Sequence, residues 1–269
     1  RIMLEQTDDL IAGTRILMKA LGAGKAIIGT EDNKLDAVEA IQARLPADGS
    51  ITVKAVRTKY PQGAEKMLAK ALLSLEIPSG GYPSSVGLAV FNVSSTAQLG
   101  CLLPQSRGVI ERVVTITGPG IGKPGNYTVA IGTPIRFLLE QLGFRGNAQH
   151  LILGGPMMGG TVSSLDVPIT KGCGGVLVLT EKDTQDRMPP SAYPCVNCGS
   201  CVKVCPMHLN PCHLGKLAYK HRYEEMADAF QLNDCFECGC CSYVCPSGIP
   251  LVQYFRISKA SNREKAKAS

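Results

Sequence analysis

The sequence has no tryptophan, and aromatic residues make up only 5% of its 269 residues. Proteins that bind single-stranded nucleic acid without sequence preference stack the bases on aromatic rings beside a basic groove. With so few rings we expect no nucleic-acid partner. The net charge of +6 is a modest excess that is compatible with nucleotides, acidic electron carriers or lipid headgroups and selects none of them.

Long apolar runs are also lacking. No stretch approaches the roughly 18 consecutive apolar residues of a membrane span, and no basic and then apolar leader opens the chain. The sequence therefore predicts a soluble or peripheral protein. Ten of its twelve cysteines lie between residues 195 and 245 and come without an export signal, so metal-bound thiolates in a reducing cytoplasm fit better than disulfides.

Helix and strand patterns alternate over residues 1–107, which predicts a Rossmann-like α/β domain with a parallel sheet. The expected helices span 7–23, 34–45 and 63–75, and the expected strands span 25–31 and 50–58. Residues 108–180 change to strands around one helix at 133–143, which predicts a β-grasp-like module. A polar, proline-rich linker at 181–194 precedes the cysteine domain at 195–258, and a charged tail covers 259–269.

The cysteine domain holds the same motif twice, forty residues apart. "CVNCGSCVKVCP" (195–206) and "CFECGCCSYVCP" (235–246) both follow the pattern C-x2-C-x2-C-x3-C-P. In two-cluster ferredoxins, three cysteines of such a run bind one [4Fe–4S] cluster and the fourth binds the other. The pattern assigns one cluster to Cys195, Cys198, Cys201 and Cys245, and the second cluster to Cys235, Cys238, Cys241 and Cys205.

Zinc is the alternative, since it also takes four thiolates, but it leaves the third cysteine and the Cys-Pro of each motif without a role. The segment between the motifs begins with Asn210 and Pro211 in cap and first-turn positions and predicts a helix over 212–230. This is typical of all-helical ferredoxin modules. Among the other cysteines, Cys240 is expected to pack beside a cluster, and Cys101, Cys173 and Cys212 are expected to be small buried hydrophobic residues.

Two glycine-rich stretches are weak signals for phosphate binding. Residues 22–25 ("GAGK") and 118–125 ("GPGIGKPG") both lead into an expected strand, so neither offers a helix N-terminus to an anion. Tight turns account for these glycines. No Ser/His/Asp or Cys/His arrangement is visible, so no catalytic residue is nominated.

The chain resembles the RnfC family of the Rnf ion-translocating electron transport complex over essentially its whole length. The resemblance is carried by the cysteine repeat with "IPLVQYFRISKA" directly after it, and by "RVVTITGPGIGKPGNYTVAIGTPIRFLLEQLGF", "GGPMMGG" and "TKYPQGAEKML". It implies an FMN and NADH site in the α/β domain, an SLBB-like β-grasp module, and a peripheral position on the cytoplasmic face of the cell inner membrane.

The resemblance also implies a function and partners. The chain would belong to an NADH:ferredoxin-type oxidoreductase that translocates ions, passing electrons between NADH or FMN and two [4Fe–4S] clusters, toward or from ferredoxin. Its partners would be ferredoxin and the other subunits of the membrane-bound complex. Two alternatives stay open: a soluble flavoprotein that reduces cobalamin, and a non-enzymatic iron–sulfur relay or docking subunit.

By the same resemblance, "YPQGAE" faces flavin and nicotinamide, which nominates Tyr60, Gly63 and Glu65. The segment "VFNVSST" would lie against the flavin phosphate, which nominates Asn92 together with Ser95 or Thr96. The alternative for Tyr60 and Glu65 is that they merely begin a helix. The family's Gly-rich flavin loop lies upstream of Arg1, so we expect the α/β domain to be N-terminally incomplete and its FMN site with it.

Overall fold

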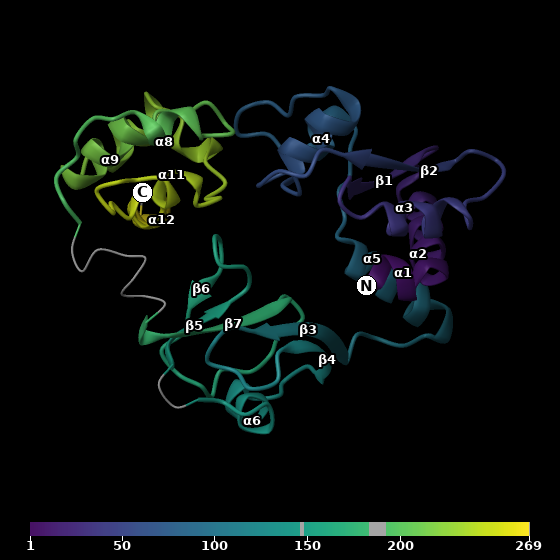
Figure 1. The fold of residues 1–269 in the computed structure, drawn as a ribbon. Coiled ribbons are helices and arrows are strands. Elements are labelled where there is room, and N and C mark those ends of the chain that lie inside the picture. Colours follow the sequence, from purple (N-terminus) through teal and green to yellow (C-terminus); the bar gives the residue numbers. More distant parts are fainter. Residues whose placement is uncertain (146–147, 183–191, 269) are drawn as a thin grey trace. The chain divides into compact units, whose positions relative to one another are not determined.

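The computed structural model describes residues 1–145, 148–182 and 192–268, which are coloured along the chain in Figure 1. It separates into two compact units, Arg1–Val109 and Ile110–Ser269. The first unit is the predicted α/β domain. The second unit contains a mixed β module followed by a helical cysteine module, as the predicted fold class requires. Among the described helices, none is long and apolar enough to cross a membrane.

The N-terminal unit is built on a parallel pair of strands, as the alternating pattern predicts. Strand β1 (Ala26–Glu31) pairs in parallel with β2 (Ile51–Val56), and the register runs from Ala26 opposite Ile51 to Glu31 opposite Val56. The described helices are α1 (Ile2–Glu5), α2 (Thr7–Leu21), α3 (Leu35–Gln42), α4 (Glu65–Leu73) and α5 (Val93–Leu102). Their apolar faces meet the sheet in a core of Leu10, Ile11, Ile28, Ile41, Ile51 and Ala97.

Local sequence signals set the ends of these helices. Helix α2 ends at Gly22, whose φ of 65° is the left-handed conformation that closes a helix, and Ala23 N–H then donates to Met18 O. Helix α5 begins at Asn92, whose side chain accepts a hydrogen bond from Ser94 N at 2.9 Å. The segment between α4 and α5 contains a short 3₁₀ turn, Pro83–Val86.

The mixed-sheet module has one helix between its second and third strands. Its elements are β3 (Glu111–Thr117), β4 (Gly125–Ala130), α6 (Ile135–Gln141), β5 (Ala148–Leu153), β6 (Gly160–Thr161) and β7 (Gly175–Thr180). The strand order is β4-β3-β7-β5-β6, with β3 and β7 parallel in the middle and the other pairs antiparallel. This is the arrangement expected of a β-grasp. Its core includes Val114, Ile116, Ile135, Leu139, Ile169 and Val178, all fully buried or nearly so.

Glycines in the segment 118–125 are needed for close packing within this sheet, not for binding a phosphate. Gly118 has a φ of 117°, and a Cβ there would lie 2.2 Å from Val178 O in β7. A Cβ on Gly120 would lie 2.6 Å from the Val178 side chain. Only glycine therefore lets the loop between β3 and β4 close against β7.

The regular elements of the described cysteine module are all helices. Its helices are α8 (Ser200–Lys203), α9 (Pro211–Tyr219), α10 (Tyr223–Asp228), α11 (Cys240–Tyr243) and α12 (Leu251–Ala268). They enclose a core that includes Leu214, Leu217, Met226, Leu232, Leu251 and Phe255. The green and yellow helices of Figure 1 form this module.

Two expectations for this module need correction. The single helix expected over 212–230 is two helices, because the chain turns at His221, whose φ of 54° is left-handed. Residues 259–268 of the expected charged tail are not a separate segment but the second half of α12, which is continuous from Leu251. One face of the helix is buried where that half begins: Ser258 is fully buried, and the Lys259 side chain is only 10% exposed.

Candidate metal centres and flavin site

The two cysteine motifs repeat their backbone conformation as well as their sequence. Asn197 and Gly199 of the first motif and His208, two residues after it, are left-handed, with φ values of 55°, 74° and 55°. The equivalent positions forty residues later, Glu237, Gly239 and Gly248, have φ values of 62°, 87° and 63°. Left-handed residues alternating with right-handed ones turn successive backbone N–H groups inward, a concave arrangement that binds anions, including iron–sulfur groups.

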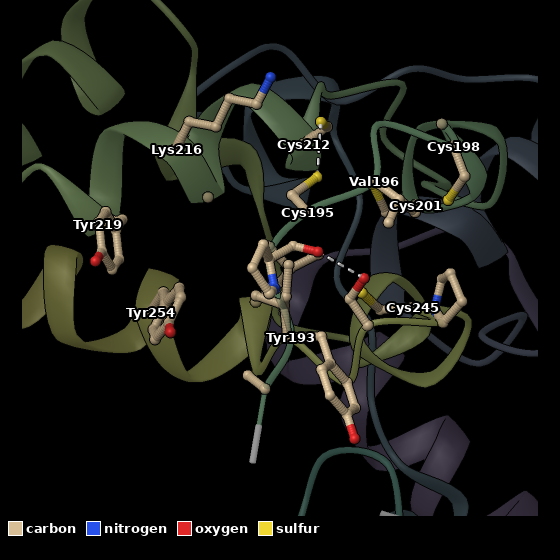
Figure 2. Close-up of a pocket in the computed structure, with 18 of the residues that line it drawn as sticks. Tyr193, Cys195, Val196, Cys198, Cys201, Cys212, Lys216, Tyr219, Cys245 and Tyr254 are labelled. Carbon is tan, nitrogen blue, oxygen red and sulfur yellow. Dashed lines mark hydrogen bonds between the residues drawn. The ribbon is translucent and has the colours of Figure 1, made fainter. Parts of the chain in front are cut away.

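The first predicted ligand set lines a single cavity. Cys195, Cys198, Cys201 and Cys245 all border a space of about 510 Å³, shown in Figure 2. Cys195 and Cys198 are exposed, whereas Cys201 and Cys245 are partly buried. A hydrogen bond with Ser200, 3.5 Å from Cys198 Sγ, lowers the pKa of the Cys198 thiol. The cavity thus joins three cysteines of the first motif with the last cysteine of the second.

The second predicted ligand set is more deeply buried. Burial, and after it the nearby thiols of Cys235, Cys238 and Cys205, raise the pKa of Cys241 to about 12. Burial is also the largest cause that raises the pKa of Cys235, with Cys205 again among the neighbouring thiols. Cys205 of the first motif therefore lies with three cysteines of the second.

The donor chemistry of each set fits a [4Fe–4S] cluster, which takes four cysteine thiolates. Within the described residues, no three His, Cys, Asp or Glu side chains gather tightly enough around one point to hold a single metal ion. The first set instead lines a cavity. Cluster binding would remove the protons from these thiols, since the thiolate is the ligand.

Two further cysteines lie beside these sets. Cys212 lines the same cavity as the first set, and its Sγ is 3.9 Å from Cys195 Sγ (Figure 2). It is only partly buried, so the expectation of a small buried hydrophobic residue is wrong for Cys212. Cys240 interacts with Cys238, and burial is the first cause that raises its pKa to about 11. Of the other two, Cys173 is buried as expected, whereas Cys101 is partly buried, so the expectation is wrong for Cys101 as well.

A group of charged residues adjoins the second set and was not anticipated from the sequence. Glu237, which lies between Cys235 and Cys238 in the chain, accepts hydrogen bonds from Arg256 Nε at 3.0 Å and from Lys259 Nζ at 3.1 Å. Lys259 also donates to the backbone oxygen of Cys235. The only sequence signal was the i, i+3 spacing of Arg256 and Lys259 on one helix face.

The residues nominated for flavin and nicotinamide lie at the starts of two helices. Tyr60 is 51% exposed, Gly63 is exposed with open space where a Cβ would point, and Glu65 is the first residue of α4. Between them, Gln62 is only 3% exposed, and its Nε2 has no hydrogen-bond partner among the described residues. A buried amide donor without a partner fits a site that a ligand oxygen completes.

Asn92, Ser95 and Thr96 form the other start, at the N-terminus of α5. Asn92 and Ser95 are exposed, whereas Thr96 is 7% exposed and its Oγ1 donates to Asn92 O at 3.2 Å. The positive end of a helix suits an anion such as a flavin phosphate. The Asn92 side chain already caps α5, which gives it a structural role of its own. Thr96 is buried and faces the interior.

The chain matches three known protein-family models, one for each of its three modules and in the same order along the sequence. Residues 1–100 match the Nuo51 FMN-binding domain, residues 113–160 match the SLBB domain, and residues 194–249 match the 4Fe-4S dicluster domain. The predictions of an FMN-binding α/β domain, an SLBB-like module and a two-cluster ferredoxin module are thereby confirmed at the level of domain families.

Curated relatives match almost the whole chain. The chain is 44% identical to the C subunit of the proton-translocating ferredoxin:NAD(+) oxidoreductase complex of Clostridium ljungdahlii, over 99% of this chain and 59% of that protein. It belongs to the RnfC family of ion-translocating oxidoreductase complexes. The C subunit of the ion-translocating oxidoreductase complex of Yersinia enterocolitica is 42% identical, over 98% of this chain and 37% of that protein.

A third relative, the C subunit of the Na(+)-translocating ferredoxin:NAD(+) oxidoreductase complex of Acetobacterium woodii, is 37% identical, over 83% of this chain and 50% of that protein. The chain thus spans about half the length of the curated relatives it matches. Among solved structures, a NAD+-reducing [NiFe]-hydrogenase in the H2-reduced state aligns with 97% of this chain and 53% of its own, with a TM-score of 0.61. At 15% sequence identity, this likeness shows the fold alone.

Proposed function

We propose that this chain is the electron-transfer part of an NADH:ferredoxin-type oxidoreductase in an ion-translocating complex. It passes electrons between NADH, with FMN as the entry cofactor, and two [4Fe–4S] clusters, toward or from ferredoxin. The observation that carries the proposal is the exchange of one cysteine between the two motifs, with Cys245 on the cavity of the first set and Cys205 among the thiols of the second. Such interleaving brings two clusters close together, which suits a relay of single electrons.

The ligand assignment follows from this arrangement. Cys195, Cys198, Cys201 and Cys245 hold the first cluster, and Cys235, Cys238, Cys241 and Cys205 hold the second. The left-handed residues of both loops support the assignment, because they orient backbone N–H groups toward an anionic group. The cluster supplies the redox chemistry, and the chain supplies thiolates, burial and nearby charge that set the potential.

For the flavin site we propose that Tyr60, Gly63 and Glu65 face the flavin and nicotinamide rings, and that Asn92, Ser95 and Thr96 lie against the phosphate. The unpartnered Gln62 Nε2 and the open space at Gly63 support a ligand at the start of α4. The N-terminus of α5 supports an anion there. FMN would convert the two-electron donor NADH to single-electron steps.

The partners proposed are ferredoxin and the other subunits of the complex, with the chain held peripherally at the cytoplasmic face of the inner membrane. The names of the curated relatives support this proposal, since each is the C subunit of an ion-translocating or ferredoxin:NAD(+) oxidoreductase complex.

The test is anaerobic reconstitution of the chain with iron and sulfide, followed by iron analysis and EPR after dithionite. About eight iron atoms per chain and two interacting reduced clusters are expected. The full-length protein is then loaded with FMN and treated with NADH. Reduction of the clusters by NADH supports the proposal, whereas reduction by dithionite alone identifies a relay protein. Turnover of a corrinoid in the same assay would instead point to a cobalamin reductase.

A further inference from the structure

The first ligand set has five thiols around its cavity, not four. Besides Cys195, Cys198, Cys201 and Cys245, the cavity is lined by Cys212, which comes from α9 and belongs to neither motif. Its sulfur is 3.9 Å from that of Cys195, so the two thiols are in contact and both border the cavity (Figure 2). No spacing rule for ferredoxin motifs anticipates this thiol.

The position of Cys212 is fixed by its helix. Cys212 is the second residue of α9, directly after Pro211, and Asn210 caps that helix by accepting a hydrogen bond from His213 N at 3.0 Å. The side chain of Asn197, within the first motif, lies 3.9 Å from both the Cys195 and Cys212 sulfurs. The two thiols therefore share a neighbour and face the same space from different segments.

The two thiols differ in how they are protected. Cys195 is exposed and lies in a segment without regular secondary structure, whereas Cys212 is partly buried on a capped helix. An exposed thiolate is the more accessible of the two to oxidants and alkylating reagents. Cys212 is thus the better protected donor of the two neighbouring thiols.

We infer that Cys212 is a reserve ligand of the first cluster, able to replace Cys195 when that thiolate is lost. The inference rests on the proposed function, because it assumes that the first set holds a [4Fe–4S] cluster. The exchange is a substitution of one thiolate for another at iron, in which Cys212 loses its proton and no electron is transferred. Cys198 serves as the comparison, because the Cys198 thiol is hydrogen-bonded to Ser200, whereas Cys212 lies against Cys195.

The test compares reconstituted chains that carry Cys195→Ala, Cys212→Ala, both substitutions, or Cys198→Ala. We expect about eight iron atoms in the wild type, in Cys212→Ala and in Cys195→Ala, and about four in the double variant and in Cys198→Ala. The EPR signal of the second cluster, present in every variant, reports that the module has folded. Cys195→Ala with only about four iron atoms beside a wild type with about eight overturns this inference alone.

A second measurement does not depend on iron yield. Alkylation followed by mass spectrometry should modify Cys212 in the reconstituted wild type and leave it unmodified in reconstituted Cys195→Ala, where it binds the cluster. Alkylation of Cys212 to the same extent in both overturns the inference. A wild type that holds no cluster at either set overturns the proposed function and the inference together, so the two failures are distinguishable.

Discussion

Gly13 of α2 and Gly100 of α5 lie backbone to backbone at the point where the two helices meet. A Cβ on Gly100 would lie 2.5 Å from the Gly13 nitrogen and 1.9 Å from Asp9 O. A Cβ on Gly13 would lie 1.9 Å from Thr96 O. No side-chain movement relieves these contacts, because the atoms belong to the backbone. The pair therefore allows α5, with its proposed phosphate-binding start, to pack closely on α2.

Gly100→Ala should destabilise the N-terminal unit by at least about 1–3 kcal/mol, the usual cost of overpacking. The sign of this change in the free energy of unfolding is informative, since alanine in place of glycine within a helix normally stabilises by about 1 kcal/mol. Hydrogen exchange of α2 and α5, followed by mass spectrometry, measures the change. Gly24→Ala is the control, because nothing lies within 4 Å of its Cβ position. Equal protection in both variants would contradict the close packing.

Cys198→Ser should remove one cluster, whereas Cys240→Ser should leave both, because Cys240 lies outside the two proposed sets of four. Iron analysis of the reconstituted chains should give about four and about eight atoms per chain. Cys240 adjoins Cys238, so its loss is expected to alter the EPR line shape rather than the iron count. About eight iron atoms in Cys198→Ser would show that the ligand assignment is wrong.

Lys259→Met should lower the reduction potential of the second cluster by on the order of 50 mV, about a tenfold change in a one-electron equilibrium. The ammonium group of Lys259 lies beside Cys235 and Glu237, and positive charge there stabilises the more negative reduced state. An EPR-monitored redox titration gives the potential. Lys265→Met, on the same helix but 61% exposed and paired with Glu224, serves as the control. A shift of equal size in both variants would argue against a local effect of Lys259.

Thr58→Val should raise the pKa of Asp32. The Asp32 carboxylate, directly after β1, accepts hydrogen bonds from Thr58 Oγ1 at 2.6 Å and from Thr58 N at 2.9 Å, and these lower its pKa below 3.8. The stabilisation is fully present above pH 3.8 and is lost as the pH falls through the lowered pKa. The stability deficit of the variant should therefore be largest near neutral pH and shrink in acid.

Carbon-detected NMR titration of the carboxyl groups measures this effect directly. Asp48 is the internal control, because its pKa is lowered by Ser50 and not by Thr58. Its titration should be the same in wild type and variant, and an unchanged Asp32 titration would contradict the role of Thr58.

Asn92→Ala should cost about 1 kcal/mol of stability in the N-terminal unit, because it removes the cap of α5. Asn92→Ser, which can still accept a hydrogen bond from the helix, should retain most of that stability. Hydrogen exchange of the first turn of α5 reports the cap, and FMN titration of the full-length protein reports any effect on flavin. A loss of flavin affinity in Asn92→Ser without a loss of stability would show a direct contact with the phosphate.

The sequence determined the order of the modules and the chemistry of the cysteine domain. Alternating helix and strand patterns placed β1, β2, α2, α3 and α4 within a few residues, since the apolar period of each segment reports its own conformation. They did not predict α1 or α5. The cysteine spacing nominated eight ligands because three thiols in one short loop must share a site. The fold class and family inferred from these features are confirmed, and the individual ligands remain predictions.

Only the tertiary structure decided which groups from distant segments meet. It brings the Cys212 sulfur to 3.9 Å from that of Cys195, and it places Lys259 so that it donates a hydrogen bond to Glu237. It also leaves the Gln62 amide buried without a partner among the described residues. The break at His221 also escaped the helical pattern, because the surrounding residues favour a helix and a single left-handed residue ends it. A sequence pattern records the period of one segment, whereas contacts between segments depend on how helices pack, and that depends on the whole core.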